Sequence, residues 1–276
     1  MLTLEDNELL CRIGPGTPMG ELMREYWLPA IRSDELPEPD CPPLRTKLMG
    51  EELIAFRDTN GKIGLLDNYC PHRRVSLFFG RNEECGLRCV YHGWKFDVDG
   101  NCVDMPSEPP ESTFNDKVKI KTYPCIERNG IIWAYLGSRE VPPPLPELEA
   151  NMHPDYNITV LHRSNNWLQG IEGEMDTIHA SFLHLGHMKV EDTVPDSLFY
   201  YFQTASRDGK FSVRRTEYGT SYGMYRPAGD DSYYWRIGHM LFPTFAMVPG
   251  LPTLLAMRQD LSHTFQWMTS TPWNGM

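Results

Sequence analysis

Two short stretches, Cys70-Pro71-His72-Arg73 and Cys89-Val90-Tyr91-His92-Gly93-Trp94, each carry one cysteine and one histidine, with sixteen residues between His72 and Cys89. Both lie at the ends of runs that we expect to form hairpin strands. Two such loops can enclose one metal centre between two thiolates and two imidazoles. Pro71 would stiffen the first loop, and Gly93 would let the backbone of the second approach the centre. The sequence therefore predicts one metal site formed by Cys70, His72, Cys89 and His92.

The residues around these loops indicate an antiparallel β domain. LIAFRD and KIGLLDN flank Thr59-Asn60-Gly61, and Asn129-Gly130 separates KTYPCIE from IIWAYLG. Turn residues between β-branched and aromatic runs are typical of hairpins. The proline-rich run 141–146 ends this alternation and indicates a domain boundary. Beyond it we expect one helix from Trp167 to about Leu185, followed by strand-like runs such as YYWRIGHMLF.

Composition and charge exclude several classes of protein. The 276 residues carry a formal net charge of −11, and the longest basic runs are the pairs Arg73-Arg74 and Arg214-Arg215. A nucleic-acid or anionic-membrane surface is therefore not expected. The N-terminus has acidic residues where a secretory signal needs a basic start, and no stretch approaches the roughly 20 apolar residues of a membrane span. We expect a cytoplasmic protein, in which seven cysteines do not form a disulfide framework.

The pattern of two cysteines and two histidines has alternatives, which are structural zinc or chance. The flanking residues favour neither, because Cys70-Pro71-His72-Arg73 and Cys89-Val90-Tyr91-His92-Gly93-Trp94 closely resemble the cluster-binding loops of oxygenase-type Rieske proteins. In a Rieske [2Fe–2S] centre, two thiolates hold one iron and two histidines hold the other, which raises the reduction potential. Cys85 has no histidine at the right distance after it. The remaining cysteines are expected to be small core or surface residues, namely Cys11, Cys41, Cys102 and Cys125.

A second motif lies after the proline-rich boundary. Asn166-Trp167 leads to Asp176, with His179 three residues later and His184 five residues after that. This element resembles the mononuclear-iron helix of Rieske ring-hydroxylating oxygenases. The resemblance extends from about Met1 to Trp273 and is nearest to the phthalate 4,5-dioxygenase-like branch. It implies that His179 and His184 bind Fe(II), and that Asp176 connects His179 to His92 of a neighbouring subunit.

Helix geometry makes this assignment testable. At about 100° per residue, Asp176 and His179 lie about 60° apart on a helix, whereas His179 and His184 lie about 140° apart. The two histidines can therefore share one metal only if the helix is distorted or ends between them. By spacing alone, His184 and His187 would be the better pair. The resemblance favours His179 and His184 and leaves His187 as a neighbouring or surface residue.

The third iron ligand is expected to be missing. Two histidines and one carboxylate form the facial triad of non-haem iron oxygenases. In the family this carboxylate lies well downstream, near the end of a longer chain. None of the available residues has a similar sequence context, and these are Asp192, Asp196, Asp208, Asp230, Asp231 and Asp260. We therefore expect a C-terminally truncated chain that lacks this ligand.

The expected fold is α+β, with an antiparallel β Rieske domain followed by a mixed α+β, helix-grip-like catalytic domain. We expect an N-terminal segment at 1–44, the Rieske domain at 45–140 and an incomplete catalytic domain at 141–276. The resemblance also implies a homo-oligomer, in the form of a trimer.

The expected function is the oxygenase component of an aromatic-ring dioxygenase, with dioxygen as co-substrate and an aromatic acid such as phthalate as substrate. No GxGxxG or P-loop pattern occurs, so NAD(P)H would act only through a partner reductase that carries flavin and [2Fe–2S]. Arginines that could bind a substrate carboxylate are Arg207, Arg214, Arg215, Arg226, Arg236 and Arg258. The alternatives are a monooxygenase or O-demethylase with the same ligands, a Rieske electron carrier, and a non-functional partial chain.

Overall fold

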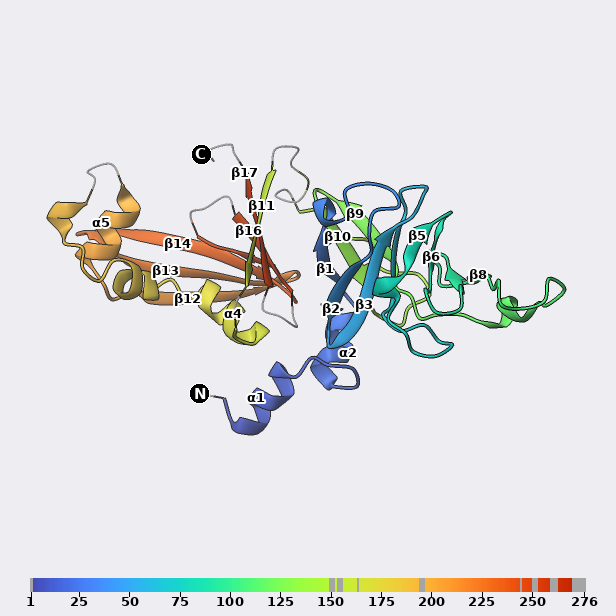
Figure 1. Ribbon diagram of the computed structural model, residues 1–276. Helices are drawn as coiled ribbons and strands as arrows, with labels where there is room; N and C mark the ends of the chain where they lie inside the picture. The colour runs from blue at the N-terminus through green and yellow to red at the C-terminus, as the bar shows by residue number, and fades with distance from the viewer. Residues whose placement is uncertain are drawn as a thin grey trace.

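The structure is a computed structural model that describes residues 2–148, 152, 156–162, 164–193, 197–243, 245–249, 253–258 and 263–269. Figure 1 shows two β-rich parts that lie side by side, one coloured blue to green along the chain and the other yellow to red. Helices accompany the sheets in both parts. The predicted mixed α+β class is confirmed.

Three antiparallel sheets form the N-terminal part. Its strands are β1 (Trp27–Arg32), β2 (Leu44–Leu48), β3 (Glu51–Arg57), β4 (Ile63–Asp67), β5 (Arg81–Glu83), β6 (Gly86–Arg88), β7 (Lys95–Phe96), β8 (Cys102–Asp104), β9 (Cys125–Arg128) and β10 (Ile131–Tyr135). The strand orders are β1-β10-β9, β2-β3-β4 and β5-β6-β7-β8. The hairpins predicted around Gly61 and Asn129-Gly130 are confirmed. Asn129 and Gly130 have φ of 45° and 74°, as a tight two-residue hairpin turn requires.

Strand β1 begins before the domain boundary expected at residue 45. It pairs with β10, with Leu28 opposite Ala134 and Pro29 opposite Trp133. Pro29 is tolerated because β1 lies at the edge of its sheet, where its missing N–H leaves no acceptor unpaired. Part of the expected N-terminal segment therefore belongs to the first sheet. The helices before it are α1 (Leu4–Cys11) and α2 (Pro18–Arg24), whose N-caps are Thr3 and Thr17.

The C-terminal part is built on one seven-stranded antiparallel sheet with the order β11-β17-β16-β15-β14-β13-β12. The strands are β11 (Tyr156–His162), β12 (Lys210–Thr216), β13 (Gly219–Gly229), β14 (Ser232–Leu241), β15 (Phe245–Met247), β16 (Thr253–Arg258) and β17 (His263–Thr269). Helices α4 (Trp167–Met175) and α5 (Leu198–Ala205) lie beside the long strands in Figure 1. In the described part of the chain, every helix is too short or too polar to cross a membrane.

One continuous helix from Trp167 to Leu185 is a wrong prediction. Helix α4 ends at Met175, and a π-helical turn, η4 (Ala180–His184), follows after a break. Asp176 causes the break, because its Oδ1 accepts hydrogen bonds from the backbone N–H groups of Ile178 (2.8 Å) and His179 (3.3 Å). An aspartate that binds the N–H groups two and three residues ahead starts a new turn. The short 3₁₀ turns are η1 (Ser33–Glu35), η2 (Leu77–Phe79), η3 (Phe114–Lys117) and η5 (Val190–Asp192).

A shared hydrophobic core joins the two parts. Trp167 and Ile171 of α4 and Ala246 of β15 belong to the same buried cluster as Leu28 and Ala134 of the first sheet. Each fully buried large apolar side chain stabilises the fold by roughly 1.5–3 kcal/mol. The Trp167 Nε1–H also donates to the carbonyl of Leu10 at 2.9 Å, which holds α1 against α4. The start of the second predicted motif is therefore anchored to the N-terminal part.

Candidate functional site

The first cysteine–histidine loop is a tight turn after strand β4. Cys70 is buried, whereas His72 is exposed. The backbone N–H of Cys70 donates to the carbonyl of Val75 at 2.9 Å, and the N–H of Arg74 donates to the carbonyl of Cys70 at 2.9 Å. These two bonds close the loop and turn the thiol inward.

The second loop connects β6 to β7 and closes in the same way. The N–H of Cys89 donates to the carbonyl of Trp94 at 2.9 Å, and the N–H of Gly93 donates to the carbonyl of Cys89 at 3.1 Å. Arg88 fixes this loop, because its guanidinium donates to Gly93 O and to Asp104 Oδ2, both at 2.7 Å. It also donates to the Glu83 carboxylate at 2.6 Å. The loop is therefore held from the sheet beneath it.

The two loops bring their thiols and imidazoles together. The ring centroids of His72 and His92 lie 4.5 Å apart, and His72 stacks on Trp94 at 4.4 Å with an interplanar angle of 9°. A hydrogen bond between the thiols raises the pKa of Cys70 and lowers the pKa of Cys89. Backbone N–H groups of His72 and Arg73 point at the Cys70 sulfur, and those of Tyr91 and His92 point at the Cys89 sulfur.

This arrangement fits a [2Fe–2S] cluster. His92 Nδ1 is buried without a hydrogen-bond partner among the described residues, as expected of a nitrogen that serves as a metal ligand. Backbone N–H groups aimed at sulfur are a known way of tuning iron–sulfur clusters. Within the described residues, no three His, Cys, Asp or Glu side chains converge closely enough to hold a single metal ion. Tetrahedral zinc, the alternative for the four residues Cys70, His72, Cys89 and His92, is therefore disfavoured.

The second motif places His179 and His184 together. Their ring centroids lie 5.1 Å apart. A π-turn forms hydrogen bonds between residues five apart, as between Leu185 N–H and Ala180 O at 3.0 Å, and so aligns positions i and i+5. The prediction that the helix is distorted or ends if these histidines converge is confirmed. His187 lies beyond the turn and is exposed.

Asp176 lies beside the first of these histidines. Its Oδ2 is 3.8 Å from His179 Nδ1, and half of its side chain is exposed to solvent. A carboxylate next to Nδ1 orients the imidazole so that Nε2 is available to a metal. The exposed side of the carboxylate leaves room for a second hydrogen-bond donor.

A third ligand for His179 and His184 is absent from the described residues. Asp192 accepts from the N–H of Lys189, and Asp208 accepts from the hydroxyl of Ser206. Asp230 and Asp231 are exposed in the turn between β13 and β14. The two other candidates, Asp196 and Asp260, lie outside the described residues.

Comparisons with known proteins agree with these two sites. A family model described as the Rieske [2Fe-2S] domain matches residues 26–124. The chain is 49% identical over 251 residues to the oxygenase subunit of 3-chlorobenzoate-3,4-dioxygenase of Comamonas testosteroni, covering 90% of this chain and 57% of the relative. It is 41% identical over 257 residues to the oxygenase subunit of phthalate 4,5-dioxygenase of Pseudomonas putida, covering 90% and 58%. The chain belongs to the Rieske oxygenase family.

The fold agrees with solved Rieske oxygenases. Dicamba monooxygenase bound to 3,6-dichlorosalicylic acid superimposes with a TM-score of 0.68 at 20% identity, over 91% of this chain and 79% of the other. This likeness supports the fold alone. The chain spans 57–58% of the length of the two curated relatives that it matches. The relatives' activities are therefore a basis for proposals about this Rieske oxygenase chain.

The remaining predicted residues lie in several environments. All seven cysteines are free thiols, and burial raises the pKa of Cys102 to about 11. Arg207 and Arg236 donate to backbone carbonyls, and Arg226 is fully buried under the π-turn. Arg214 and Arg215 are exposed on β12, and the side chain of Arg258 lies outside the described residues.

Sequence reasoning missed the residues that hold the loops in place. Trp94 was noted only as a flank, and neither its stacking on His72 nor the contacts of Arg88 were predicted. Arg88 directly precedes Cys89, which is the single signal that could have drawn attention to it.

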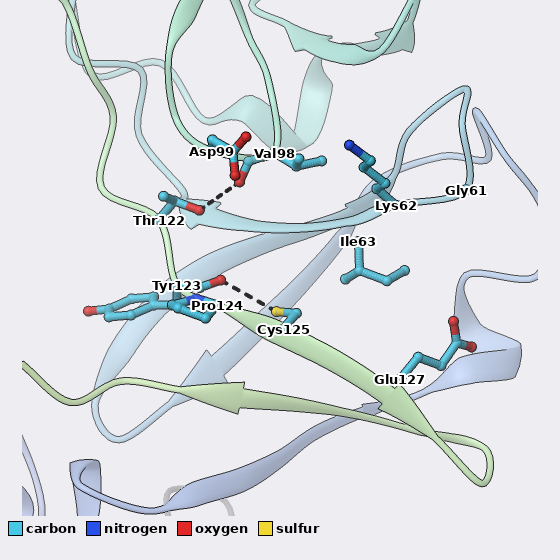
Figure 2. Close-up of a pocket in the computed structure, with 10 residues that line it drawn as sticks. All are labelled: Gly61, Lys62, Ile63, Val98, Asp99, Thr122, Tyr123, Pro124, Cys125 and Glu127. Carbon is cyan, nitrogen blue, oxygen red and sulfur yellow. Dashed lines mark hydrogen bonds between the residues drawn. The ribbon is translucent and has the colours of Figure 1, made fainter. Parts of the chain in front are cut away.

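A hollow of about 500 Å³ lies away from both sites (Figure 2). Ile63 lines it at the start of β4, whereas Cys70 follows the other end of that strand. Within it, Thr122 donates to Val98 O at 3.0 Å, and the Cys125 thiol donates to Tyr123 O at 3.5 Å (Figure 2). Burial raises the pKa of Cys125 to about 12, so this thiol stays protonated and unreactive at neutral pH.

Proposed function

We propose that this chain acts as the oxygenase subunit of a multicomponent Rieske oxygenase that hydroxylates an aromatic acid. The observation that carries the proposal is the pairing of His179 with His184 in the same chain as a Rieske domain. A pure electron carrier needs the cluster alone and has no use for a second pair of converging imidazoles. Imidazoles with open positions beside them suit non-haem iron that activates dioxygen.

The ligand assignments follow the geometry. The cluster ligands would be Cys70, His72, Cys89 and His92, and the iron ligands would be His179 and His184. When bound, these groups supply single electrons and a centre for dioxygen activation. Trp94 would keep the His72 ring in its ligand orientation by stacking, and Arg88 would keep the second loop closed.

Asp176 would connect the two centres of neighbouring subunits. Its Oδ2 lies near His179 Nδ1, and its half-exposed carboxylate can accept a second hydrogen bond from outside the subunit. The proposed donor is His92 of the neighbouring subunit, in a trimer. A carboxylate between two metal-bound imidazoles fixes their tautomers and can couple electron transfer to a proton shift.

The proposed substrate is an aromatic carboxylate, and the proposed electron donor is a reductase with flavin and [2Fe–2S]. The substrate class is supported by the relatives' names, since both 3-chlorobenzoate and phthalate are aromatic acids. A guanidinium binds a carboxylate through two parallel hydrogen bonds, so an arginine in the helical layer would suit this role. The cytoplasmic location stays a prediction.

Reconstitution tests this function directly. The purified chain is loaded with iron and sulfide, supplied with such a reductase and NADH, and tested with phthalate and 3-chlorobenzoate under labelled dioxygen. We expect substrate-dependent oxygen uptake and label in the product, whose mass distinguishes dihydroxylation from monooxygenation. A reducible cluster without iron at His179 and His184, and without oxygen uptake, would favour the electron carrier instead.

The Asp176→Asn variant tests the connection between the centres. We expect this variant to keep the reduced-cluster electron paramagnetic resonance signal and to lose substrate-dependent oxygen uptake, because the amide cannot accept from two imidazoles as a carboxylate does. Asp192→Asn is a suitable control, since Asp192 is exposed and contacts the backbone of Lys189. Retained turnover in Asp176→Asn would contradict the proposed bridge.

A further inference from the structure

A fully buried polar cluster lies beneath the π-turn. It consists of Ser181 on the turn, Gln203 on α5 and Arg226 on β13, and each is 0% exposed. Ser181 Oγ donates to Gln203 Oε1 at 2.8 Å and accepts from Arg226 Nη2 at 2.9 Å. One hydroxyl therefore connects the turn to a helix and to the sheet. We call these three residues the anchor cluster.

The π-turn directs Ser181 away from the solvent side. Bonding between residues five apart aligns His179 with His184 and Ala180 with Leu185. Ala180 and Leu185 are buried, whereas Phe182 and Leu183 are 58% and 75% exposed. The inward face of the turn thus carries the Ser181 hydroxyl, and the anchor cluster fixes the rotation of the turn about its axis.

Arg226 is an unusual residue to find at 0% exposure. Its three hydrogen-bond partners among the described residues are neutral, and besides Ser181 they are the carbonyl of Phe202 at 3.1 Å and the sulfur of Met224 at 3.3 Å. A buried charge without an anion destabilises the fold, and burial lowers the pKa of this guanidinium. What the guanidinium supplies in return is a planar fork that reaches the turn and α5 at once.

We propose that the anchor cluster positions the π-turn so that His179 and His184 can share one metal ion. A regular α-helical turn would place these histidines about 140° apart. The hydrogen bonds at Ser181 hold the wider turn in register with the sheet and oppose its relaxation to that geometry. Arg226 acts through Ser181 and is therefore a positioning residue. The inference rests on the proposed role of His179 and His184 as metal ligands.

Cobalt(II) titration of the chain with its cluster assembled tests the inference without turnover. The visible absorption of bound cobalt(II) reports affinity, and the cluster spectrum serves as an internal reference. We expect Ser181→Ala and Arg226→Gln to weaken cobalt(II) binding by roughly 10–100-fold, the usual effect of removing a residue that orients a ligand. The cluster spectrum should not change, because Cys70 and Cys89 lie in the other part of the chain.

Two matched pairs separate positioning from general packing. Gln203→Glu keeps an acceptor for Ser181 and loses no hydrogen bond, since Gln203 Nε2 has no partner among the described residues. It should bind cobalt(II) like the wild type, whereas Gln203→Leu should bind it weakly. Tyr222→Phe removes another helix-to-sheet bond from β13, the 3.3 Å bond from its hydroxyl to Glu174 O, and should leave cobalt(II) affinity unchanged.

The outcomes distinguish the two proposals. If the wild type and the His179→Ala and His184→Ala variants bind cobalt(II) equally, the metal pair itself is wrong. If binding depends on both histidines but not on Ser181 or Arg226, the positioning role is overturned while the metal pair stands. An equal loss in Tyr222→Phe would also overturn it, because the effect would then be general to helix packing. Should Ser181→Ala fail to fold, Gln203→Leu against Gln203→Glu decides the question.

Discussion

Gly93 is the position in the cluster loops where a single methyl group should have the largest effect. It adopts φ of +76°, and a Cβ there would lie 2.5 Å from Pro106 Cγ and 3.3 Å from Pro106 Cδ. Glycine is thus required by the backbone conformation and by a neighbouring proline. We therefore predict that Gly93→Ala destabilises the Rieske domain and lowers its cluster content.

The magnitude has two parts. The left-handed conformation costs a residue with a Cβ about 1–2 kcal/mol. A contact of 2.5 Å is far inside the carbon–carbon optimum of about 3.5–4.0 Å, and relieving such overpacking costs typically about 1–3 kcal/mol. Gly61 isolates the first part, because it has φ of +80° and would place its Cβ with no atom within 4 Å. Gly93→Ala should therefore exceed Gly61→Ala by about 1–3 kcal/mol.

Denaturant unfolding of the two variants measures this difference, and cluster absorbance per chain measures the effect on the site. We expect full cluster content in Gly61→Ala and reduced content in Gly93→Ala. Displacing Pro106 or shifting the loop would also disturb the bond from Arg88 to Gly93 O. Equal free energies of unfolding for the two variants would refute the reasoning about Pro106.

Three further predictions concern the N-terminal part. Arg88→Met should lower cluster content while leaving Cys89 in place, because Gly93 O and two carboxylates lose their donor; a full cluster by absorbance would contradict this. Burial raises the pKa of Glu51, but hydrogen bonds from Lys121 and Tyr123 outweigh burial, so the pKa is lowered. Its stabilising contribution should be present above about pH 4.3 and be lost at lower pH, so unfolding at pH 6 and pH 3.5 should differ more in the wild type than in Glu51→Gln. Cys125, whose pKa burial raises to about 12, should resist alkylation at pH 8 in the folded protein and react after unfolding, as mass spectrometry can measure.

Local sequence was sufficient to locate the cluster loops. Cys70 and His72, like Cys89 and His92, are separated by one or two residues, so their proximity within each loop follows from covalent geometry. The flanking hairpins were equally readable, since the turn at Asn129-Gly130 needs residues that accept positive φ. In both cases the deciding interaction acts within a few residues along the chain.

The sequence by itself determined the identity of the cysteines and histidines in each loop, the hairpins and the motif that contains His179 and His184. Only the tertiary structure decided that the two histidines converge, because a regular helix would have separated them and a π-turn held by Ser181 and Arg226 does not. It also decided that β1 completes the first sheet and that Trp94 supports His72. These features depend on contacts between residues far apart in the chain, whose energies no local pattern encodes.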